Sequence, residues 1–339
     1  MTRFLITGHA GFIGFHTARR LLDDGHDVVG IDSVNAYYDP QLKRDRLNEL
    51  SDRPKLVSHE FSIEDAGRLK ETFEEHRPEI VVHLAAQAGV RYSIEQPESY
   101  VRANLVGTCN VLEAARWNPV RHLMLASSSS VYGMNTKVPF SETDKADNPV
   151  SLYAATKKAT EALSHSYAHL YGIPTTAFRF FTVYGPWGRP DMALFKFVRA
   201  IEQGEPIDVY GGGEMRRDFT YIDDLVAAIL RLSDIVPQAG ESVGEFDTLS
   251  PVAPHRVVNL GGGTPVGLLD FIGAVESAVG KNAKRNILPM QPGDVVQTSA
   301  DPSLLTALTG EAPPATAVED GVRAFVEWWR AYQARATQP

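Results

Sequence analysis

Short apolar runs alternate with amphipathic segments along the first half of the chain, and this alternation restricts the fold more than any other feature. The expected strands are 3–8, 26–32, 55–61, 79–86, 122–126 and a run within 174–185, and the expected helices are 14–25, 63–76, 100–117 and 151–172. Consecutive strand–helix pairs form βαβ crossovers, which bury a parallel sheet between two layers of helices. The expected fold class is therefore α/β, with a doubly wound parallel sheet.

The rhythm changes after about Thr182, where turn-rich sequence begins. Beyond it, residues 193–204 read as a helix, 206–232 as strand, loop, strand and helix, 235–256 as a surface loop, 256–263 as one more buried strand, and the remainder as mostly helical. A smaller, mainly helical C-terminal substrate domain is expected to follow the sheet. The predicted division is 1–178 with a return of 220–263 for the dinucleotide domain, and 179–219 with 264–339 for the substrate domain.

A glycine triplet lies between the first expected strand and the first expected helix, in TGHAGFIGFH. Gly8, Gly11 and Gly14 are spaced three residues apart. Glycines at such a turn allow unusual backbone angles, close approach of a pyrophosphate to the main chain, and tight helix–strand packing. The first helical N–H groups then face the phosphates. This context favours a Rossmann dinucleotide site over a plain connecting turn.

Asp32 ends the second expected strand, 24 residues after Gly8. A carboxylate at this place accepts hydrogen bonds from the adenosine ribose and repels a 2′-phosphate, so NAD is predicted rather than NADP. Asn35 lies just beyond it and is a candidate for a further contact.

Tyr153 and Lys157 lie four residues apart in an expected helix, so they share one face. A lysine cation near the phenol is expected to lower the pKa of Tyr153 and to favour a phenolate base. Four serines, residues 127–130, end the strand HLMLA upstream, at the sheet edge where ligands of α/β proteins bind. Together with the glycine turn, these residues indicate a catalytic site rather than an exposed helix face and a polar loop.

The chain resembles the extended short-chain dehydrogenases/reductases, within the NAD-dependent epimerase/dehydratase family of nucleotide-sugar enzymes. The resemblance runs from Thr7 to about Asp301 and rests on TGHAGFIG, Asp32, HLAAQAGVRYS, Asn104, SSSSVYG, Tyr153-x-x-x-Lys157 and RRDFTYIDD, in this order. The segments DSVNAYYDPQLKRDRL, NPVSLYAATKK, RFFTVYGPWGRPDMA and MQPGDV are most similar to its branch of UDP-glucuronate 4-epimerases. The resemblance implies C4 epimerisation of UDP-glucuronate to UDP-galacturonate through a 4-keto sugar, with tightly bound, recycled NAD and a homodimer.

The resemblance also implies roles for individual residues. The expected catalytic residues are Tyr153, Lys157 and Ser128. The expected cofactor contacts are Gly8, Gly11, Phe12, Ile13, Gly14, Asp32, Asn35, Ser62, Ile63, Leu84, Ala85, Ala86, Asn104, Tyr153 and Lys157. The expected substrate contacts are Ser128, Ser129, Ser130, Tyr153, Thr182, Arg189, Tyr210, Arg217, Asp294 and Arg91. Ser62 departs from the family pattern, in which an adenine-contacting aspartate is common at this position. Gln291 stands where related hexose epimerases have a diphosphate arginine, so contact with the diphosphate is expected to depend more on Arg189 and Arg217.

Ser129 and Ser130 stand where family dehydratases carry an Asp–Glu pair and where glucuronate decarboxylases carry a glutamate before Val-Tyr-Gly. Without carboxylates there, water elimination lacks its acid and base, and the hydroxyls are expected to bind a sugar carboxylate together with Thr182. Three alternatives stay open: a 4-epimerase of UDP-glucose or a UDP-pentose, a UDP-glucuronate decarboxylase, and a non-catalytic NAD-sensing protein.

Composition restricts the partners. The formal net charge is −9 over 339 residues and no basic block appears, which argues against nucleic acid. The apolar runs are too short to cross a bilayer and no signal peptide is expected before the first strand. The single cysteine, Cys109, excludes an internal disulfide framework and a cysteine-rich metal site. A cytoplasmic protein without a metal is expected.

Overall fold

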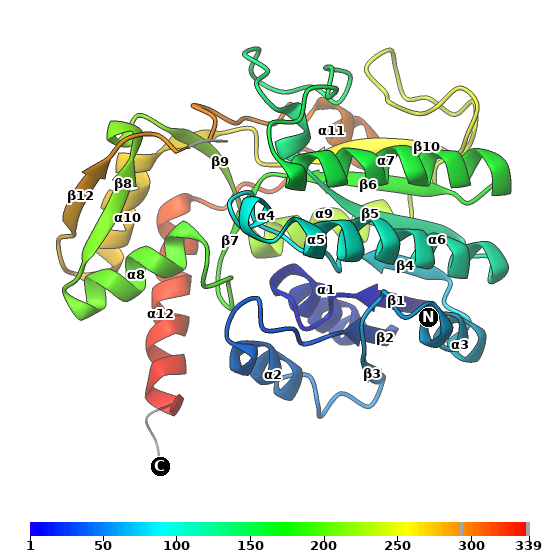
Figure 1. The fold of residues 1–339 in the computed structure, drawn as a ribbon, viewed down its shortest axis with the longest axis horizontal. Helices are drawn as coiled ribbons and strands as arrows, with labels where there is room; N and C mark the ends of the chain where they lie inside the picture. Colours follow the sequence, from blue (N-terminus) through cyan, green and yellow to red (C-terminus); the bar gives the residue numbers. More distant parts are fainter. Residues whose placement is uncertain (292–293, 337–339) are drawn as a thin grey trace.

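The computed structural model describes residues 1–291 and 294–336, and its largest element is a seven-stranded parallel sheet (Figure 1). In sheet order the strands are β10 (His255–Leu260), β6 (Thr175–Phe180), β5 (His122–Ser128), β4 (Ile80–His83), β1 (Arg3–Thr7), β2 (Asp27–Asp32) and β3 (Leu56–Glu60). The chain runs outward from β1 to β3 and then crosses back to β4. The strand order therefore reverses beside β1, which is where open α/β sheets bind ligands.

Alternate side chains of each strand enter different cores. In β1, Phe4 and Ile6 pack in one cluster with Phe15 of the first helix, whereas Leu5 packs in a second cluster with Leu69 and Val111 on the other face. Both faces of the sheet are thus covered by helices. The expected α/β doubly wound fold is confirmed. The helices in the first part of the chain are α1 (Phe12–Asp23), α2 (Pro40–Asn48), α3 (Ala66–His76), α4 (Tyr92–Glu95), α5 (Pro97–Tyr100), α6 (Gly107–Trp117), α7 (Leu152–Tyr171) and α9 (Ile222–Ser233).

A second group of elements lies at one end of the sheet, on the left in Figure 1. It contains the parallel pair β8–β12, the three-stranded sheet β11–β9–β7, and helices packed against them. The bounds are β7 (Thr182–Tyr184), β8 (Pro206–Tyr210), β9 (Arg216–Tyr221), β11 (Pro265–Gly267), β12 (Lys284–Leu288), α8 (Ala193–Gln203), α10 (Leu268–Val279) and α12 (Val318–Ala336). Helix α11 (Ser303–Thr309) packs instead against β10 and α9 of the large sheet.

Two local predictions differ from the structure. Residues 284–288 were expected to be helical, but they form β12, which pairs in register with β8 about 78 residues earlier. Helix α2 was not predicted, because its buried residues are Leu42, Lys43 and Arg46 and two of these are charged. Such a face gives no apolar periodicity. In addition, the predicted helix over 100–117 contains a π-helical turn at Val101–Val106.

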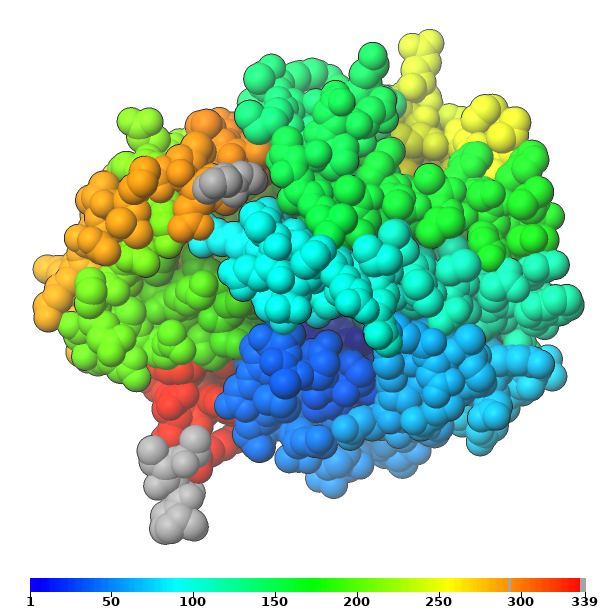
Figure 2. All heavy atoms as spheres, in the orientation of Figure 1, coloured from blue at the N-terminus to red at the C-terminus, as the bar shows by residue number. Residues whose placement is uncertain are grey.

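The α4–α5 segment covers the junction between the sheet and the second group of elements, as the cyan atoms in Figure 2 show. Arg91, which precedes α4, contacts both Tyr210 and Asp294 of the second group. Within the residues that the structure describes, every helix is too short or too polar to span a membrane.

Candidate active site

The glycine turn connects β1 to α1 and leaves no room for side chains. Gly8 has a φ of 80°, and a Cβ there would lie 2.8 Å from the backbone nitrogen of Ala85. A Cβ on Gly14 would lie 2.0 Å from the carbonyl oxygen of Gly8. Gly11 precedes the first turn of α1, and no side chain caps that turn. The bare backbone and the free N–H groups form a cradle that fits a pyrophosphate.

Asp32 is the last residue of β2 and lines a cavity together with the three glycines of the turn. Its carboxylate accepts hydrogen bonds from the backbone N–H groups of Ala10, at 3.1 Å, and Val34, at 2.8 Å. The acid therefore closes the glycine turn and still faces the space beside it. A ribose diol placed there meets an acceptor, as the sequence predicts for NAD.

Lys43 is a cavity residue that the sequence analysis missed. Its ammonium donates to the backbone and side-chain oxygens of Asn35, at 3.0 and 2.7 Å, and the residue lines the cavity with Asp32. Burial lowers the pKa of Lys43, and Asp32 acts against that effect. The only sequence signal for Lys43 is the polar run LKRDR. This run indicates a cavity residue only when α2 is known to lie beside the glycine turn.

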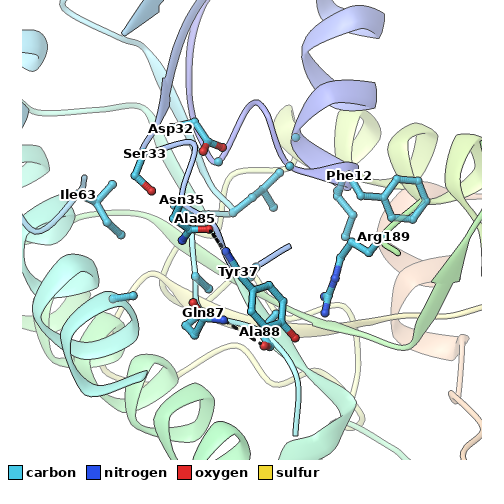
Figure 3. Close-up of a pocket in the computed structure, with 18 of the residues that line it drawn as sticks. Phe12, Asp32, Ser33, Asn35, Tyr37, Ile63, Ala85, Gln87, Ala88 and Arg189 are labelled. Atoms are coloured by element: carbon cyan, nitrogen blue, oxygen red, sulfur yellow. Dashed lines mark hydrogen bonds between the residues drawn. The ribbon is translucent and has the colours of Figure 1, made fainter. Parts of the chain in front are cut away.

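Most predicted cofactor contacts line one continuous cavity, whose empty space including its open mouth is about 1420 Å³. Figure 3 shows several of them around it. Asn104 is placed differently, because it lies fully buried behind the wall. Its side chain bonds the backbone of Gln87 at 2.8 and 3.0 Å and the Thr156 hydroxyl at 3.0 Å, and so joins the segment after β4 to α7. The predicted cofactor contacts on the cavity are Gly8, Gly11, Phe12, Ile13, Gly14, Asp32, Asn35, Ser62, Ile63, Leu84, Ala85, Ala86, Tyr153 and Lys157.

The three predicted catalytic residues line the same cavity. Ser151 caps α7 by accepting from the Ala154 N–H at 3.1 Å, which fixes the first turn of the helix that carries Tyr153. Lys157 follows one turn later and donates to the carbonyl oxygen of Ala126 in β5 at 2.8 Å. Ser128, the last residue of β5, completes the group. Strand β5 and helix α7 thus bring together residues that are 25 or more positions apart.

The expected lowering of the Tyr153 pKa by Lys157 is wrong. Burial raises the pKa of Tyr153, and the groups that oppose this effect are the Ser128 hydroxyl and the Arg189 guanidinium. The Lys157 ammonium faces the Ala126 carbonyl instead, and burial lowers the pKa of Lys157 to about 8. The groups that favour the phenolate form of Tyr153 are therefore Ser128 and Arg189 rather than Lys157.

The serine run divides after Ser128. Ser127 lines the cavity together with Ser128, and its hydroxyl donates to the buried Glu161 carboxylate at 2.7 Å. Ser129 and Ser130 begin a short 3-10 turn, are half-buried and do not line the cavity. Ser130 is nevertheless adjacent to it, because the Ser128 hydroxyl donates to the Ser130 hydroxyl at 3.1 Å.

Arg189 lines the cavity near Tyr37 (Figure 3), and its positive charge acts on the pKa of Tyr153. Its guanidinium bonds Asp191 through two nitrogens, at 3.0 and 2.5 Å, and Tyr37 donates to the same carboxylate at 3.1 Å. Burial together with Asp191 raises the pKa of Tyr37 to about 12. Thr182 lines a smaller apolar hollow next to the cavity, and Arg189 lines both.

The remaining predicted substrate contacts gather in the second group of elements, away from the cavity wall. The Arg91 guanidinium lies 4.8 Å from the centre of the Tyr210 ring and 3.3 Å from an Asp294 oxygen. Arg217 donates to the carbonyl of Val296 at 3.1 Å, and burial lowers the pKa of Arg217 while Asp294 opposes this. Pro292 and Gly293 of the same motif lie outside the described residues.

Comparisons with known proteins agree with this site. Residues 4–242 match the model of the NAD dependent epimerase/dehydratase family. A probable UDP-glucuronate 4-epimerase of Rhizobium meliloti is 58% identical over 98% of each chain, and UDP-glucuronate 4-epimerase 1 of Arabidopsis thaliana is 46% identical over 98% of this chain and 78% of its own. The structure of a Bacillus cereus UDP-glucuronic acid 4-epimerase with UDP-glucuronic acid and NAD superposes with a TM-score of 0.87, at 32% identity over 97% of this chain and 99% of that one.

These matches cover both the sheet and the elements beyond it, and the glycine turn, Asp32 and the Tyr153–Lys157 pair meet at one cavity as the family resemblance predicted. The chain therefore belongs to the NAD-dependent epimerase/dehydratase family.

Proposed function

We propose that the protein epimerises UDP-glucuronate at C4, giving UDP-galacturonate through a transient 4-keto sugar. The observation that carries this proposal is the joining of Tyr153, Ser128 and Arg189 to the glycine turn in one cavity. An oxidation-and-return reaction needs a proton-transfer group, a cofactor cradle and a contact for an anionic sugar in this arrangement. The similarity to UDP-glucuronate 4-epimerases supports the choice of substrate.

NAD would be held by the glycine turn, Asp32 and Lys43, and it would supply reversible hydride acceptance at the sugar C4. The protein's own groups then manage the proton. Tyr153 accepts the 4-hydroxyl proton during oxidation and returns it afterwards, and Ser128 hydrogen-bonds the same oxygen. The Ser128 hydroxyl and the Arg189 guanidinium favour the loss of the tyrosine proton, and Lys157 joins α7 to β5 through the Ala126 carbonyl.

The carboxylate of the substrate sets the chemical difficulty. A uronic acid oxidised at C4 is a β-keto acid, which loses CO₂ when its carboxylate bond aligns with the ketone π system. We propose that Arg189, Thr182, Ser129 and Ser130 hold the carboxylate out of that alignment. Arg189 reaches the cavity beside Tyr153, and Ser130 is one hydrogen bond from Ser128.

The nucleotide end is proposed to bind the second group of elements. Arg217 offers a cation for the diphosphate, and Asp294 an acceptor for the uridine ribose. Arg91 contacts both the Tyr210 ring and Asp294 in the same place. Because Arg217 is half-buried and donates to the neutral backbone carbonyls of Arg216 and Val296, its charge can meet the diphosphate.

We also propose that the enzyme is a cytoplasmic homodimer. Helices α6 and α7 pack side by side and leave large apolar side chains exposed, with Trp117 of α6 64% and Leu170 of α7 63% accessible. Pairing the same helices of two copies would bury them. Light scattering should give twice the 37.2 kDa of the chain; a monomer with this mass at micromolar concentration would contradict the pairing.

The decisive experiment is incubation of the purified protein with UDP-glucuronate without added NAD, with the product read by NMR. Appearance of UDP-galacturonate is the expected result. No conversion, even after NAD is added, would overturn the proposal. UDP-glucose run in parallel tests the neutral-sugar alternative, and a UDP-pentose product from UDP-glucuronate would indicate a decarboxylase.

A further inference from the structure

Side chains of α1 and α2 form hydrogen bonds with the backbone immediately before Arg189. The Nε2 atom of His16 lies 2.9 Å from the carbonyl oxygen of residue 186. One nitrogen of the Arg46 guanidinium lies 2.7 Å and 3.3 Å from the carbonyl oxygens of residues 187 and 188. Three successive carbonyls are thus held by α1 and α2, which flank the dinucleotide turn.

The other end of the same guanidinium reaches the turn itself. Its Nη1 atom donates to the carbonyl oxygen of Ala10 at 2.9 Å and to the Tyr38 hydroxyl at 2.8 Å. Ala10 lies between Gly8 and Gly11, and the Arg46 side chain is completely buried. One rigid, planar group therefore spans the distance from the glycine turn to the Arg189 segment.

Burial of the Arg46 charge costs free energy, so a role in filling space does not account for this residue. Its hydrogen-bond acceptors are three carbonyls of the turn and segment and one phenol, and no carboxylate of residues 1–291 and 294–336 forms an ion pair with it. A buried charge without a counter-ion stabilises a fold less than an apolar side chain of similar size. A role in geometry accounts for it better.

The gripped backbone has an unusual conformation. Trp187 has a φ of 61°, in the left-handed region that bulky residues rarely adopt. Such a conformation persists only where the surroundings fix it. Arg46 bonds the carbonyl of Trp187, and two residues later Arg189 enters the cavity and affects the pKa of Tyr153. The direction in which Arg189 leaves the backbone thus depends on this turn.

We propose that Arg46 is a positioning residue, which fixes the Arg189 segment to the glycine turn and so sets the distance between the cationic substrate contact and the cofactor cradle. The inference rests on the proposed function in one respect, the contact of Arg189 with an anionic sugar. The group acts through Arg189 and does not itself touch the cavity.

A double-mutant cycle on the NAD-loaded enzyme tests this inference. Arg46→Met, Arg189→Ala and the double variant are compared by kcat/KM for UDP-glucuronate, with each rate divided by the bound NAD. Arg46→Met should lose about ten- to a hundredfold, as expected for a displacement near 1 Å. In the Arg189→Ala background the same change should cost less than about twofold, because there is no longer a guanidinium to place. Losses that multiply would overturn the inference.

Arg44→Met is the matched control. Arg44 lies on the same helix, is exposed and pairs with Glu60 at 3.3 Å, so its kcat/KM should equal that of the native protein. If Arg46→Met does not fold, the cycle is run with Arg46→Lys, whose single ammonium cannot span both sides and should give a smaller but equally non-multiplicative loss. If the native protein does not convert UDP-glucuronate, the proposed function fails. The same double-mutant cycle is then measured on the Kd of UDP-glucuronate by calorimetry, and losses of affinity that multiply would overturn the inference.

Discussion

The glycine turn and the Arg189 segment line the same cavity, but different kinds of contact specify them. The turn is fixed by backbone contacts among residues 8–14, by the close approach of the Ala85 backbone to Gly8 and by the Asp32 carboxylate. The Arg189 segment depends on the side chains of Tyr37 and Arg46, 154 and 141 positions from their partners. The cofactor half is thus shaped mainly by backbone packing, whereas the substrate half depends on tertiary contacts made by side chains.

This difference separates binding of the dinucleotide from choice of the sugar. Many chemistries share such a turn, and the site residues rather than the fold decide among them. Substitutions in the glycine turn should therefore lower NAD binding, whereas substitutions in the substrate half should lower turnover or change the product.

Tyr153→Phe should have the largest effect on turnover and almost none on the cofactor. Removing the proton-transfer group is expected to lower kcat by about 10²- to 10⁴-fold. The glycine turn and Asp32 are untouched, so bound NAD per chain should match that of the native protein. Stopped assays with UDP-glucuronate and absorbance of the released cofactor measure both quantities. A variant that loses NAD in proportion to activity would show that the two halves are not separable at this residue.

Gly14→Ala should damage the cofactor half directly. Its Cβ would lie 2.0 Å from the Gly8 carbonyl oxygen and 2.9 Å from the Cα of His9, so the turn must open. We expect bound NAD to fall below about a tenth and stability to fall by about 1–3 kcal/mol. Gly273→Ala in α10 is the control, because nothing lies within 4 Å of its Cβ position and helical Ala is favoured over Gly by about 0.5–1 kcal/mol. Equal NAD content in both variants would contradict the binding of NAD by the glycine turn.

Glu161→Gln tests the long-range side of the comparison. Glu161 is buried and accepts from Ser127 at 2.7 Å and from Arg179 at 2.9 and 3.0 Å. Burial raises its pKa, but the bonds and charge of Arg179 outweigh burial and lower the pKa of Glu161 to about 2. The amide leaves a buried guanidinium unpaired, which should cost about 3 kcal/mol at pH 7.

The sign of the pH dependence follows from the lowered pKa. Stability from the ionised Glu161 is present above the unfolded pKa of 4.5 and is lost as the pH falls toward about 2. The gap between native and Glu161→Gln protein in urea unfolding should therefore narrow below pH 4.5. Glu60→Gln, which breaks the exposed pair with Arg44, should cost less than about 1 kcal/mol at any pH. A difference in unfolding free energy that stays constant with pH would show that the Glu161–Arg179 ion pair does not contribute to stability.

The same contrast explains what could be predicted from the sequence. The strands of the sheet, the turn and the Tyr153–Lys157 face follow from periodicity and short spacings, and the structure has them where they were expected. Helix α2 was missed because it buries the charged Lys43 and Arg46, whose partners are Asn35 for Lys43 and the distant carbonyls of Ala10 and Trp187 for Arg46. Strand β12 was missed because its partner is a distant strand.

The pKa of Tyr153 shows the same limit. A cation at i+4 favours a lowered value, but in the folded chain Lys157 bonds the Ala126 carbonyl and burial dominates. The charge that does act on the phenol belongs to Arg189, 36 positions later. A sequence gives the residue types of such a site, whereas their mutual electrostatics depend on which backbone groups each side chain reaches.

The smallest predicted effect is on the product rather than on the rate. In Ser129→Ala/Ser130→Glu, a carboxylate stands one hydrogen bond from Ser128 and repels the sugar carboxylate. We expect the UDP-pentose to rise from none to about a tenth of the product, which corresponds to ~1.4 kcal/mol between the two outcomes. Ser129→Ala/Ser130→Gln has the same size without the charge and should release no pentose. NMR of the products distinguishes them: pentose from both variants would assign the effect to packing, and pentose from neither would remove the serines from control of the carboxylate. A charge effect confined to the glutamate variant would show that residues beyond the cofactor turn decide the fate of the keto sugar.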